Sequence, residues 1–436
     1  MSRILCVLAV VLLQWLTLKA DSIPQPKEWS YAECVEYAKA NNISIQQSRL
    51  VEQTDEYSLE AARARWAPSL GFATTHTLRN SPWAESNKNS YTGDYGLNAS
   101  WTVWDGGERE NTIRREKLQV GIDALGTTDR TRTVETELLS VYINILYARE
   151  AITINEDAAT VSAAQAERAR QLMEAGRLSR VDYAQLAAQA EQDRYNVVSA
   201  KSSYDSRCME LKKLLELGID DGITAAPVDW SGDEVMRSLP PLDESYRMAV
   251  SIDAKLEASR LEQQSAAYDV KIAKAGYYPS ISLNAGVGTA YGTPGRFAEG
   301  IKTGVSESVG ITLSVPILDN KKTRTAVAQA RIKELNSALD YQSRANEIGQ
   351  TVEGWYIDLR AAQARYSAGN AQVESARLSD ELVNEQFELG LVNTVELMQA
   401  HNTLVQARHE LLQAKYMAML GHKMIEYYRT ASVAMP

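Results

Sequence analysis

Residues 278–288 of the chain are YPSISLNAGVG, and this stretch decides the fold. After Pro279, aliphatic residues alternate with small or polar ones, the aliphatic set being Ile281, Leu283, Ala285 and Val287. Alternation with a period of two predicts a β-strand that has one apolar face and one polar face. Residues 308–317, SVGITLSVPI, alternate in the same way and predict a second strand.

Both strands have roughly ten residues, about the length that a tilted strand needs to cross a bilayer. Aromatic residues stand near the ends of these strands and of two similar segments in the first half of the chain: Tyr91, Trp101, Trp104, Tyr277, Tyr278 and Tyr291. Length and aromatic ends favour membrane strands, although a soluble hairpin fits the alternation equally well. Segments 81–90 and 292–304 are rich in Ser, Asn, Gly and Pro, so we expect exposed loops there.

The same features occur earlier in the chain, which indicates a duplicated unit. Weaker alternation runs through residues 69–74 and 97–103. Three landmarks keep their order with offsets of 211, 214 and 214 residues (279 − 68, 319 − 105, 390 − 176): Pro68 and Pro279, Asp105 and Asp319, Gly176 and Gly390. We therefore predict a first repeat over 21–217, a linker over 218–241 with several Gly and Pro residues, and a second repeat over 242–436.

Residues 1–20 have the pattern of a secretory signal peptide. Arg3 precedes an apolar run from Ile4 to Leu18, and Leu18-Lys19-Ala20 fits a cleavage site. We expect cleavage after Ala20. Beyond this segment the sequence has no apolar run of eighteen residues, so a membrane-spanning part must consist of β-strands that close into a barrel.

Two very long helices are predicted over 107–176 and 321–390, because neither stretch contains a proline. Each could extend on the order of 100 Å at 1.5 Å per residue. Shorter helices are expected at 38–66 and 181–217 in the first repeat, and at 246–278 and 395–428 in the second. Two short helices together match one long helix in length, so they could stack end to end beside it, with turns at Gly176 and Gly390.

The helices are rich in Ala, Gln, Glu and Arg and have narrow apolar edges. Soluble coiled coils are one interpretation, but such helices are better suited to the wall of a hollow cylinder that is wet on both sides. Four strands cannot close a membrane barrel, whose smallest form has about eight. We therefore expect the chain to assemble with copies of itself, and the sequence alone permits two, three or more.

Charge and cysteine content limit the partners. The formal net charge is −10, and it becomes −12 once Arg3 and Lys19 are removed with the signal peptide. Because no block of Lys and Arg stands out, we expect no nucleic-acid partner. Two cysteines remain in the mature chain, Cys34 and Cys208. A bridge between them is possible, but we expect two buried unpaired thiols.

The motifs together resemble the TolC family of outer-membrane efflux proteins. The resemblance rests on the two-fold repeat, the Pro-Ser entry into each strand pair, the Trp-Asp-Gly-Gly exit at 104–107 and the Gly-Leu-Val-Asn-Thr-Val-Glu-Leu turn at 390–397. It covers nearly the whole mature chain. No single motif is diagnostic, but their order at matched spacing is specific.

The resemblance implies a mainly α-helical homotrimer with a 12-stranded β-barrel in the outer-membrane lipid, continued by a 12-helix α-barrel through the periplasm. It further implies a passive duct for efflux or type I secretion, which docks with a periplasmic adaptor protein onto an inner-membrane transporter. No cofactor is expected.

The resemblance also suggests site residues. It places carboxylates of the periplasmic tip at a channel constriction, where Asp182, Glu396, Gln185 and Gln399 match. It implies adaptor contact at the tip by Gly176, Arg177, Arg180, Gly390, Val392 and Phe387. Val392 and Phe387 depart from the Arg and Tyr usual in the family, which puts its closed-state lock in doubt. Arg177 and Arg180 could serve as replacement partners for the acids. Without the resemblance, solvated surface acids would be the simpler interpretation.

The sequence offers no sign of an enzyme. It contains no phosphate-binding loop, nucleophile elbow or zinc-ligand spacing. The histidines at 76, 401, 409 and 422 are scattered, and packing or solvent exposure is a better explanation for them than a metal site. The alternative to a duct is a periplasmic adaptor or secreted coiled-coil scaffold. Four alternating strands, with no β-domain after the last helix, favour the duct.

Overall fold

The computed structural model describes residues 28–83, 89–218, 222–292, 304–433 and 435. The predicted signal peptide and the centres of the two predicted loops, 84–88 and 293–303, lie outside the described residues. The chain divides into two compact units. Unit 1 comprises Met1–Ile43, Thr131–Ala249 and Thr351–Pro436, and unit 2 comprises Ser44–Arg130 and Val250–Gln350. Each unit therefore takes segments from both halves of the sequence.

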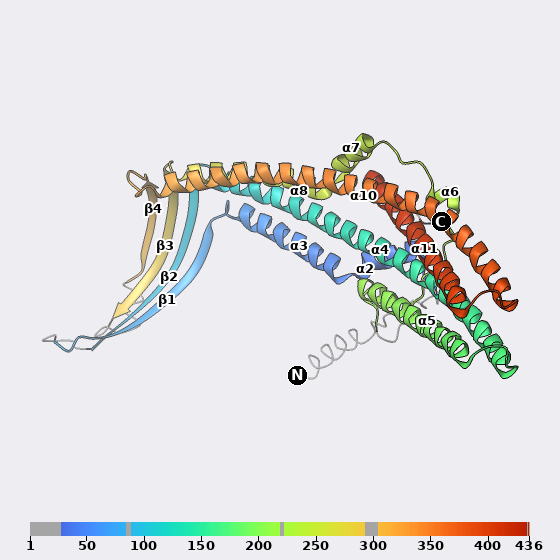
Figure 1. The fold of residues 1–436 in the computed structure, drawn as a ribbon. Helices are drawn as coiled ribbons and strands as arrows, with labels where there is room; N and C mark the ends of the chain where they lie inside the picture. The colour runs from blue at the N-terminus through green and yellow to red at the C-terminus, as the bar shows by residue number, and fades with distance from the viewer. Residues whose placement is uncertain (1–27, 84–88, 219–221, 293–303, 434, 436) are drawn as a thin grey trace, which may run out of the picture. The chain divides into compact units, whose positions relative to one another are not determined.

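Unit 2 contains one antiparallel sheet of four strands in the order β1-β2-β3-β4 (Figure 1). The strands are β1 (Ser69–Asn80), β2 (Asn89–Trp104), β3 (Ser280–Gly292) and β4 (Ser306–Ser314). All four predicted strand segments are present. The last is shorter than the alternation suggested, since β4 ends at Ser314 and does not reach Ile317. Pro316, which has no backbone N–H to donate to a ladder, accounts for the early end.

The register gives the sheet two different faces, because residues paired across neighbouring strands point to the same side. Phe72 pairs with Leu97, and Leu97 pairs with Val287, so these side chains share an apolar face. Neighbouring positions Gly71, Asn98 and Gly286 are paired in the same way and form a face of small and polar residues.

Aromatic residues stand at both ends of the apolar face. At one end, the rings of Tyr91 and Tyr291 are tilted by 57° with their centroids 5.6 Å apart, and the Tyr91 hydroxyl lies 2.8 Å from His76 Nδ1. Tyr291 lies over Gly93, where an added Cβ would be 2.6 Å from the tyrosine ring. At the other end, Trp101 Nε1 donates to the Trp66 carbonyl at 2.9 Å.

The junction between strand and long helix explains the Trp-Asp-Gly-Gly motif. Helix α4 (Glu108–Glu174) starts after Gly106 and Gly107, whose φ angles are +67° and +84°. A Cβ on Gly106 would lie 2.8 Å from the Ala275 carbonyl, so a side chain does not fit. Arg109 is buried and its Nη1 donates to the Thr102 carbonyl at 2.8 Å, which ties the helix to β2.

Unit 2 also holds α3 (Ile43–Ala64), α8 (Ala254–Ala275) and the first part of α10 (Lys322–Glu388). The predicted helices 38–66 and 246–278 are each divided in two, because α2 (Tyr31–Asn41) precedes α3 and α7 (Leu242–Ile252) precedes α8. Asn42 and Asp253 make the breaks. Asn42 Nδ2 donates to the Leu214 carbonyl at 2.9 Å, and Asp253 Oδ1 accepts from the Leu256 N–H at 2.7 Å. Asp253 thus caps the start of α8, whereas Asn42 satisfies a carbonyl at the end of α5.

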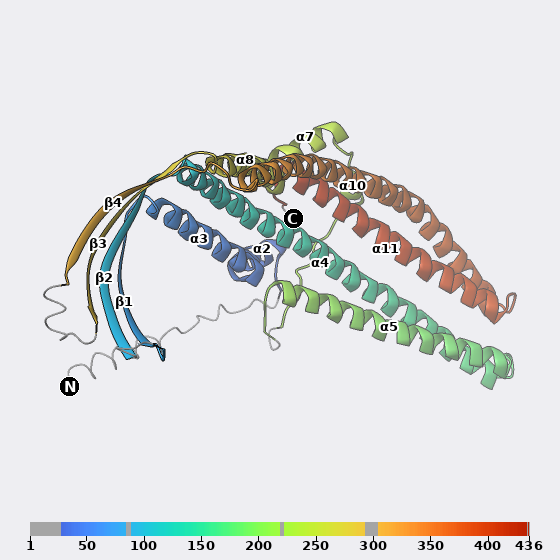
Figure 2. The same ribbon diagram turned by 90° about the vertical axis from the view of Figure 1, so that its left-hand side faces the viewer.

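Unit 1 is helical. It holds α2, α5 (Arg180–Leu214), α6 (Gly232–Val235), α7 and α11 (Thr394–Thr430), together with the later parts of α4 and α10. In both views α5 runs beside the later part of α4, and α11 beside the later part of α10 (Figures 1 and 2). We call these two pairs the first hairpin and the second hairpin.

The described part of the predicted linker is packed. Trp230 and Val235 are buried, and Ala225 forms a β-bridge with Trp29. The buried Tyr142 hydroxyl donates to the carbonyls of Trp29 and Ala226, at 3.0 and 3.1 Å. These contacts fix the segment to α4.

Cys34 and Cys208 are free and buried, as expected. Burial raises the pKa of the Cys34 thiol to about 12. Over the described ranges, none of the helices combines the length and hydrophobicity needed to cross a membrane.

Candidate functional site

The two helical hairpins turn in the same way. Gly176 has a φ of +71° and donates its N–H to the Met173 carbonyl at 3.0 Å, while the N–H of Arg177 reaches the Leu172 carbonyl at 2.8 Å. This is a Schellman cap, in which the left-handed residue satisfies carbonyls at the helix end. The turn lies where sequence analysis predicted it.

Gly390 repeats the arrangement in the second hairpin. Its φ is +75°, its N–H donates to the Phe387 carbonyl at 3.0 Å, and the Leu391 N–H donates to the Gln386 carbonyl at 2.9 Å. An added Cβ would meet nothing within 4 Å at either glycine. Backbone conformation, not lack of space, therefore requires glycine at both turns.

The predicted acids stand in the first turn of the next helix. Ser179 caps α5: its Oγ accepts from the Asp182 N–H at 3.1 Å and donates to Asp182 Oδ2 at 2.7 Å. Asn393 caps α11: its Oδ1 accepts from the Glu396 N–H at 2.9 Å, and its Nδ2 donates to Glu396 Oε1 at 3.0 Å. Both carboxylates thus stabilise a helix N-terminus, where negative charge is favoured.

A side chain from the second hairpin contacts the first of these acids. Thr394 is buried, and its Oγ1 donates to Asp182 Oδ1 at 2.9 Å, with Gln185 Oε1 also 2.9 Å away. Hydrogen bonds from Ser179, followed by that from Thr394, lower the pKa of Asp182. Asp182 is consequently ionised over a wide pH range while it joins the two hairpins.

An apolar cluster in the same two hairpins contains one residue from each of four helices. Its buried members are Ala169, Leu186, Phe387 and Leu397, from α4, α5, α10 and α11 respectively. Val392 packs against the cluster. Phe387 is 9% exposed, so both residues at which the chain departs from the family pattern serve to pack the hairpins together. We call this set the tip cluster.

The arginines of the first turn are exposed. Neither Arg177 nor Arg180 forms an ion pair within the described part of the chain, and Asp182 is held by Ser179 and Thr394 instead. Apolar side chains are also exposed around the second turn, with Leu389 73% and Leu391 72% exposed. The surface of the turns is therefore partly basic and partly apolar.

Glu396 and Gln399 line a groove to which Asp182 does not contribute. Together with Ser379 and Thr403 they line a shallow groove of about 270 Å³ between α10 and α11. Glu396 bonds only to its cap residue Asn393 in the described structure. The chain by itself therefore brings Asp182 and Gln185 together through Thr394, and Glu396 and Gln399 together in the groove.

Sequence analysis missed Thr394, the capping residues and a buried hydrogen bond between Asp193 and His401. The caps had a signal, since Ser179 and Asn393 each stand three residues before an acid, which is the spacing of a capping box. The buried pair had none, because its two members lie 208 residues apart.

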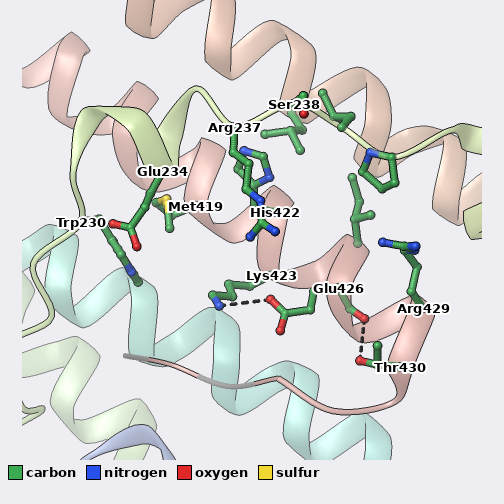
Figure 3. Close-up of a pocket in the computed structure, with 14 residues that line it drawn as sticks. Trp230, Glu234, Arg237, Ser238, Met419, His422, Lys423, Glu426, Arg429 and Thr430 are labelled. Atoms are coloured by element: carbon green, nitrogen blue, oxygen red, sulfur yellow. Dashed lines mark hydrogen bonds and ion pairs between the residues drawn. The ribbon is translucent and has the colours of Figure 1, made fainter.

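A larger crevice of about 550 Å³ lies elsewhere in unit 1, between the described linker residues and α11 (Figure 3). Its charged groups are largely paired: Lys423 Nζ donates to Glu426 at 3.1 Å, and Arg429 Nη2 donates to Glu244 at 2.7 Å. Burial lowers the pKa of His422. We interpret the crevice as the seam where the linker packs onto α11.

Comparison with known proteins was made on sequence and on structure. A profile of the family described as outer membrane efflux protein matches residues 34–216 and 246–419. The chain is 21% identical over 386 residues to the outer membrane efflux protein BepC of Brucella suis, a match that covers 87% of this chain and 80% of BepC. It is 22% identical over 395 residues to the outer membrane protein TolC of Escherichia coli, covering 87% and 78%.

Among solved structures, CusC superposes with a TM-score of 0.79 at 16% identity, and the match covers 93% of this chain and 94% of CusC. At that identity the likeness shows the fold alone. The family profile compares sequences, and residues 34–216 and 246–419, which it matches, make up most of this chain.

Proposed function

Because this chain belongs to the outer membrane efflux protein family, we propose that it assembles as a homotrimer into a passive export duct. The chain is an outer-membrane channel protein for efflux or secretion, and it extends from the outer membrane into the periplasm. In this proposal the signal peptide 1–20 is removed, and repeats 21–217 and 242–436, joined by 218–241, build the wall. The duct performs no chemistry of its own.

The open edges of the sheet are the observation on which the proposed assembly rests. The sheet ends in two open edges, because β1 and β4 have no partner on their outer sides among the described residues. Unpaired N–H and C=O groups at such an edge are very costly in lipid, where no water can satisfy them. Pairing β4 of one copy with β1 of the next satisfies both edges, and three copies give a closed barrel of twelve strands.

The two faces of the sheet support its place in the membrane. The apolar face carries Phe72, Leu97 and Val287 with aromatic residues at both ends, which suits a lipid-facing surface between two interfaces. The opposite face, with Gly71, Asn98 and Gly286, suits a wet interior. Small polar side chains on this face would leave space inside the barrel for the exported molecules.

The helices also support assembly. On α10, Ile332, Leu335 and Leu339 are 59%, 66% and 62% exposed in the single chain. They recur at spacings of three and four residues and so share one side of the helix. Burying this stripe against a neighbouring copy would give a periplasmic α-barrel of twelve helices.

At the turns we propose an entrance. Three copies of Asp182 and Glu396, with Gln185 and Gln399 one turn further along, would surround a constriction that attracts cations and repels anions. The lowered pKa of Asp182 supports this role, since its charge persists into acid solution.

We further propose that the turns receive a periplasmic adaptor protein and, through it, an inner-membrane transporter. The exposed residues Arg177, Arg180 and Leu391, with Gly176 and Gly390 shaping the turns, would form the contact. Val392 and Phe387 would act from beneath by keeping the hairpins packed.

The assembly can be tested on the full-length protein after outer-membrane extraction into detergent. Light scattering corrected for bound detergent should give the mass of three chains, and planar bilayers should show ion conductance. A different closed oligomer that still conducts would contradict the trimer alone. A monomer recovered from the soluble periplasm would contradict the duct.

A further inference from the structure

The groove between α10 and α11 corresponds to a surface of the first hairpin. The two hairpins match residue for residue: α4 and α10 each have 67 residues, and α5 and α11 start 214 residues apart (394 − 180). We call residues at this offset counterparts. Glu396 is the counterpart of Asp182, and Gln399 is the counterpart of Gln185. Because the helix lengths and the turns agree, counterparts lie on the same face of their hairpins.

In the first hairpin this face is covered by the second hairpin. Thr394 Oγ1 donates to Asp182 Oδ1 at 2.9 Å and lies 2.9 Å from Gln185 Oε1. Further from the turn, Gln165 Nε2 donates to Asn384 Oδ1 at 2.7 Å. All three residues of the first hairpin are partly buried in this contact.

The corresponding face of the second hairpin is exposed. Glu396, Gln399 and Ser379 stand at the counterpart positions, and all three are exposed where they line the groove of about 270 Å³. The Glu396 carboxylate accepts from its cap residue, Asn393, and from no other side chain among the described residues. The same face is therefore covered in one hairpin and open in the other.

The first hairpin carries a side chain that suits this groove. Arg180 is the counterpart of Thr394, the residue that bonds to the covered face. It is exposed and forms no ion pair within the described ranges. A guanidinium group has five N–H donors and a positive charge, so one arginine can bond both the Glu396 carboxylate and the Gln399 amide oxygen.

This contact cannot be made within one chain. Arg180 and Asp182 are two residues apart on α5, and residues at that spacing do not share a side of a helix. Because Asp182 faces the second hairpin, Arg180 faces away from it. Glu396 is likewise two residues from Thr394 and faces away from the first hairpin. The contact therefore needs a second copy, and repeated head to tail it can close a ring.

We propose that the groove receives the first hairpin of a second copy of the chain, and that Arg180 of the second copy binds Glu396 and Gln399. This inference rests on the proposed function, because it concerns neighbours in the proposed assembly. It assigns Arg180 to the contact between copies and leaves Arg177 and Leu391 for an adaptor. The arginine also offsets part of the negative charge of Glu396 at the proposed constriction.

Cross-linking of the full-length protein in detergent tests the contact. Arg180→Cys combined with Gln399→Cys, treated with a short reagent that joins two thiols, should give denatured bands of two and three chains. Each single variant should stay at the mass of one chain, as should the wild type, whose Cys34 and Cys208 are buried. Arg180→Cys with Glu410→Cys, at an exposed position further along α11, is the matched control and should not be linked.

The outcomes separate this inference from the proposed function. Gln185→Cys with Thr394→Cys, the corresponding pair within one chain, should lose both thiols to the reagent without a change of mass, which establishes its reach. If light scattering gives the mass of three chains but positions 180 and 399 are not linked, the inference is overturned and the trimer stands. A monomer would contradict the proposed function and the inference together.

Charge reversal gives a second test without cross-linking. Arg180→Glu should lower by roughly 5 °C the temperature at which the assembly dissociates in detergent, since like charges then meet at each contact. Adding Glu396→Arg should restore most of the loss, because the pair is then exchanged and again complementary. Arg177→Glu, at an exposed arginine of the same turn, should gain nothing from Glu396→Arg. Equal responses of the two arginine variants to Glu396→Arg would contradict the contact.

Discussion

The hydroxyl of Thr394, at the first position of α11, donates a hydrogen bond to the Asp182 carboxylate in the first turn of α5, with the two oxygens 2.9 Å apart. The contact links the first hairpin to the second at their turns. It also links one predicted site residue to a residue that the sequence analysis had not included among the site residues.

Thr394→Val should weaken this link. Valine keeps the shape of threonine but cannot donate, so we expect a local loss of about 1.5–3 kcal/mol, the range for a hydrogen bond to a charged group. Exchange protection of residues 180–186 would measure it. Thr403→Val is the matched control, because Thr403 is exposed on the same helix and its hydroxyl bonds only to the Gln399 carbonyl. Equal effects of the two variants would contradict the link.

The proposed constriction predicts ion selectivity. Asp182→Asn combined with Glu396→Gln should lower the cation-to-anion permeability ratio in planar bilayers by about threefold or more. In a trimer, the two substitutions would remove six carboxylates from a narrow passage. Assembly should be unchanged. Glu410→Gln, a similar change further along α11, should leave the ratio near that of the wild type. If the double variant is as selective as the wild type, these acids do not line the constriction.

Selectivity should also depend on pH through Ser179. The Ser179 hydroxyl is the largest cause of the lowered pKa of Asp182. With a lowered pKa, the carboxylate persists above that value and is lost as pH falls through it. Ser179→Ala should raise the pKa of Asp182 toward its ordinary range, so cation selectivity should fall at a higher pH than in the wild type. Reversal potentials measured along an acid titration would show the shift, and identical titration curves would argue against it.

Replacing a turn glycine and replacing a glycine inside a helix should change the free energy of unfolding in opposite directions. Gly176→Ala or Gly390→Ala should each destabilise the turn by about 1 kcal/mol, since alanine is strained at positive φ although space is free. Gly354→Ala lies inside α10, with nothing near an added Cβ, and should stabilise the helix by about 0.5–1 kcal/mol. Denaturation midpoints would compare the three variants. A stabilising effect at either turn would contradict the backbone argument.

The order of helices and strands was predictable from the sequence, because helices and strands differ in their periodicity and the same pattern occurs in both repeats. Proline-free stretches predicted both long helices, and Gly176 and Gly390 marked their turns. The breaks at Asn42 and Asp253 were not predicted, since both residues also occur within helices. Their effect depends on a carbonyl of another helix in one case and on an N-cap bond in the other.

Within the candidate site, local patterns were readable and distant pairings were not. The acids, glycines and turns repeat at a fixed offset in the sequence. Thr394 meets Asp182, and His401 meets Asp193, only after two hairpins pack together. Phe387 and Val392 looked like surface residues of a turn, whereas packing of four helices places them against the tip cluster.

The two turns have the same cap, the same three-residue step to the next helix and the same position for the acid. Residues 174–182 and 388–396 therefore have the same backbone geometry but different side chains. Grafting residues 388–396 into the place of 174–182 would yield a chain with two identical turns, which keeps Thr394 and replaces Asp182 with glutamate. Such chimaeras offer a way to study the surface of each turn separately from the scaffold that carries it.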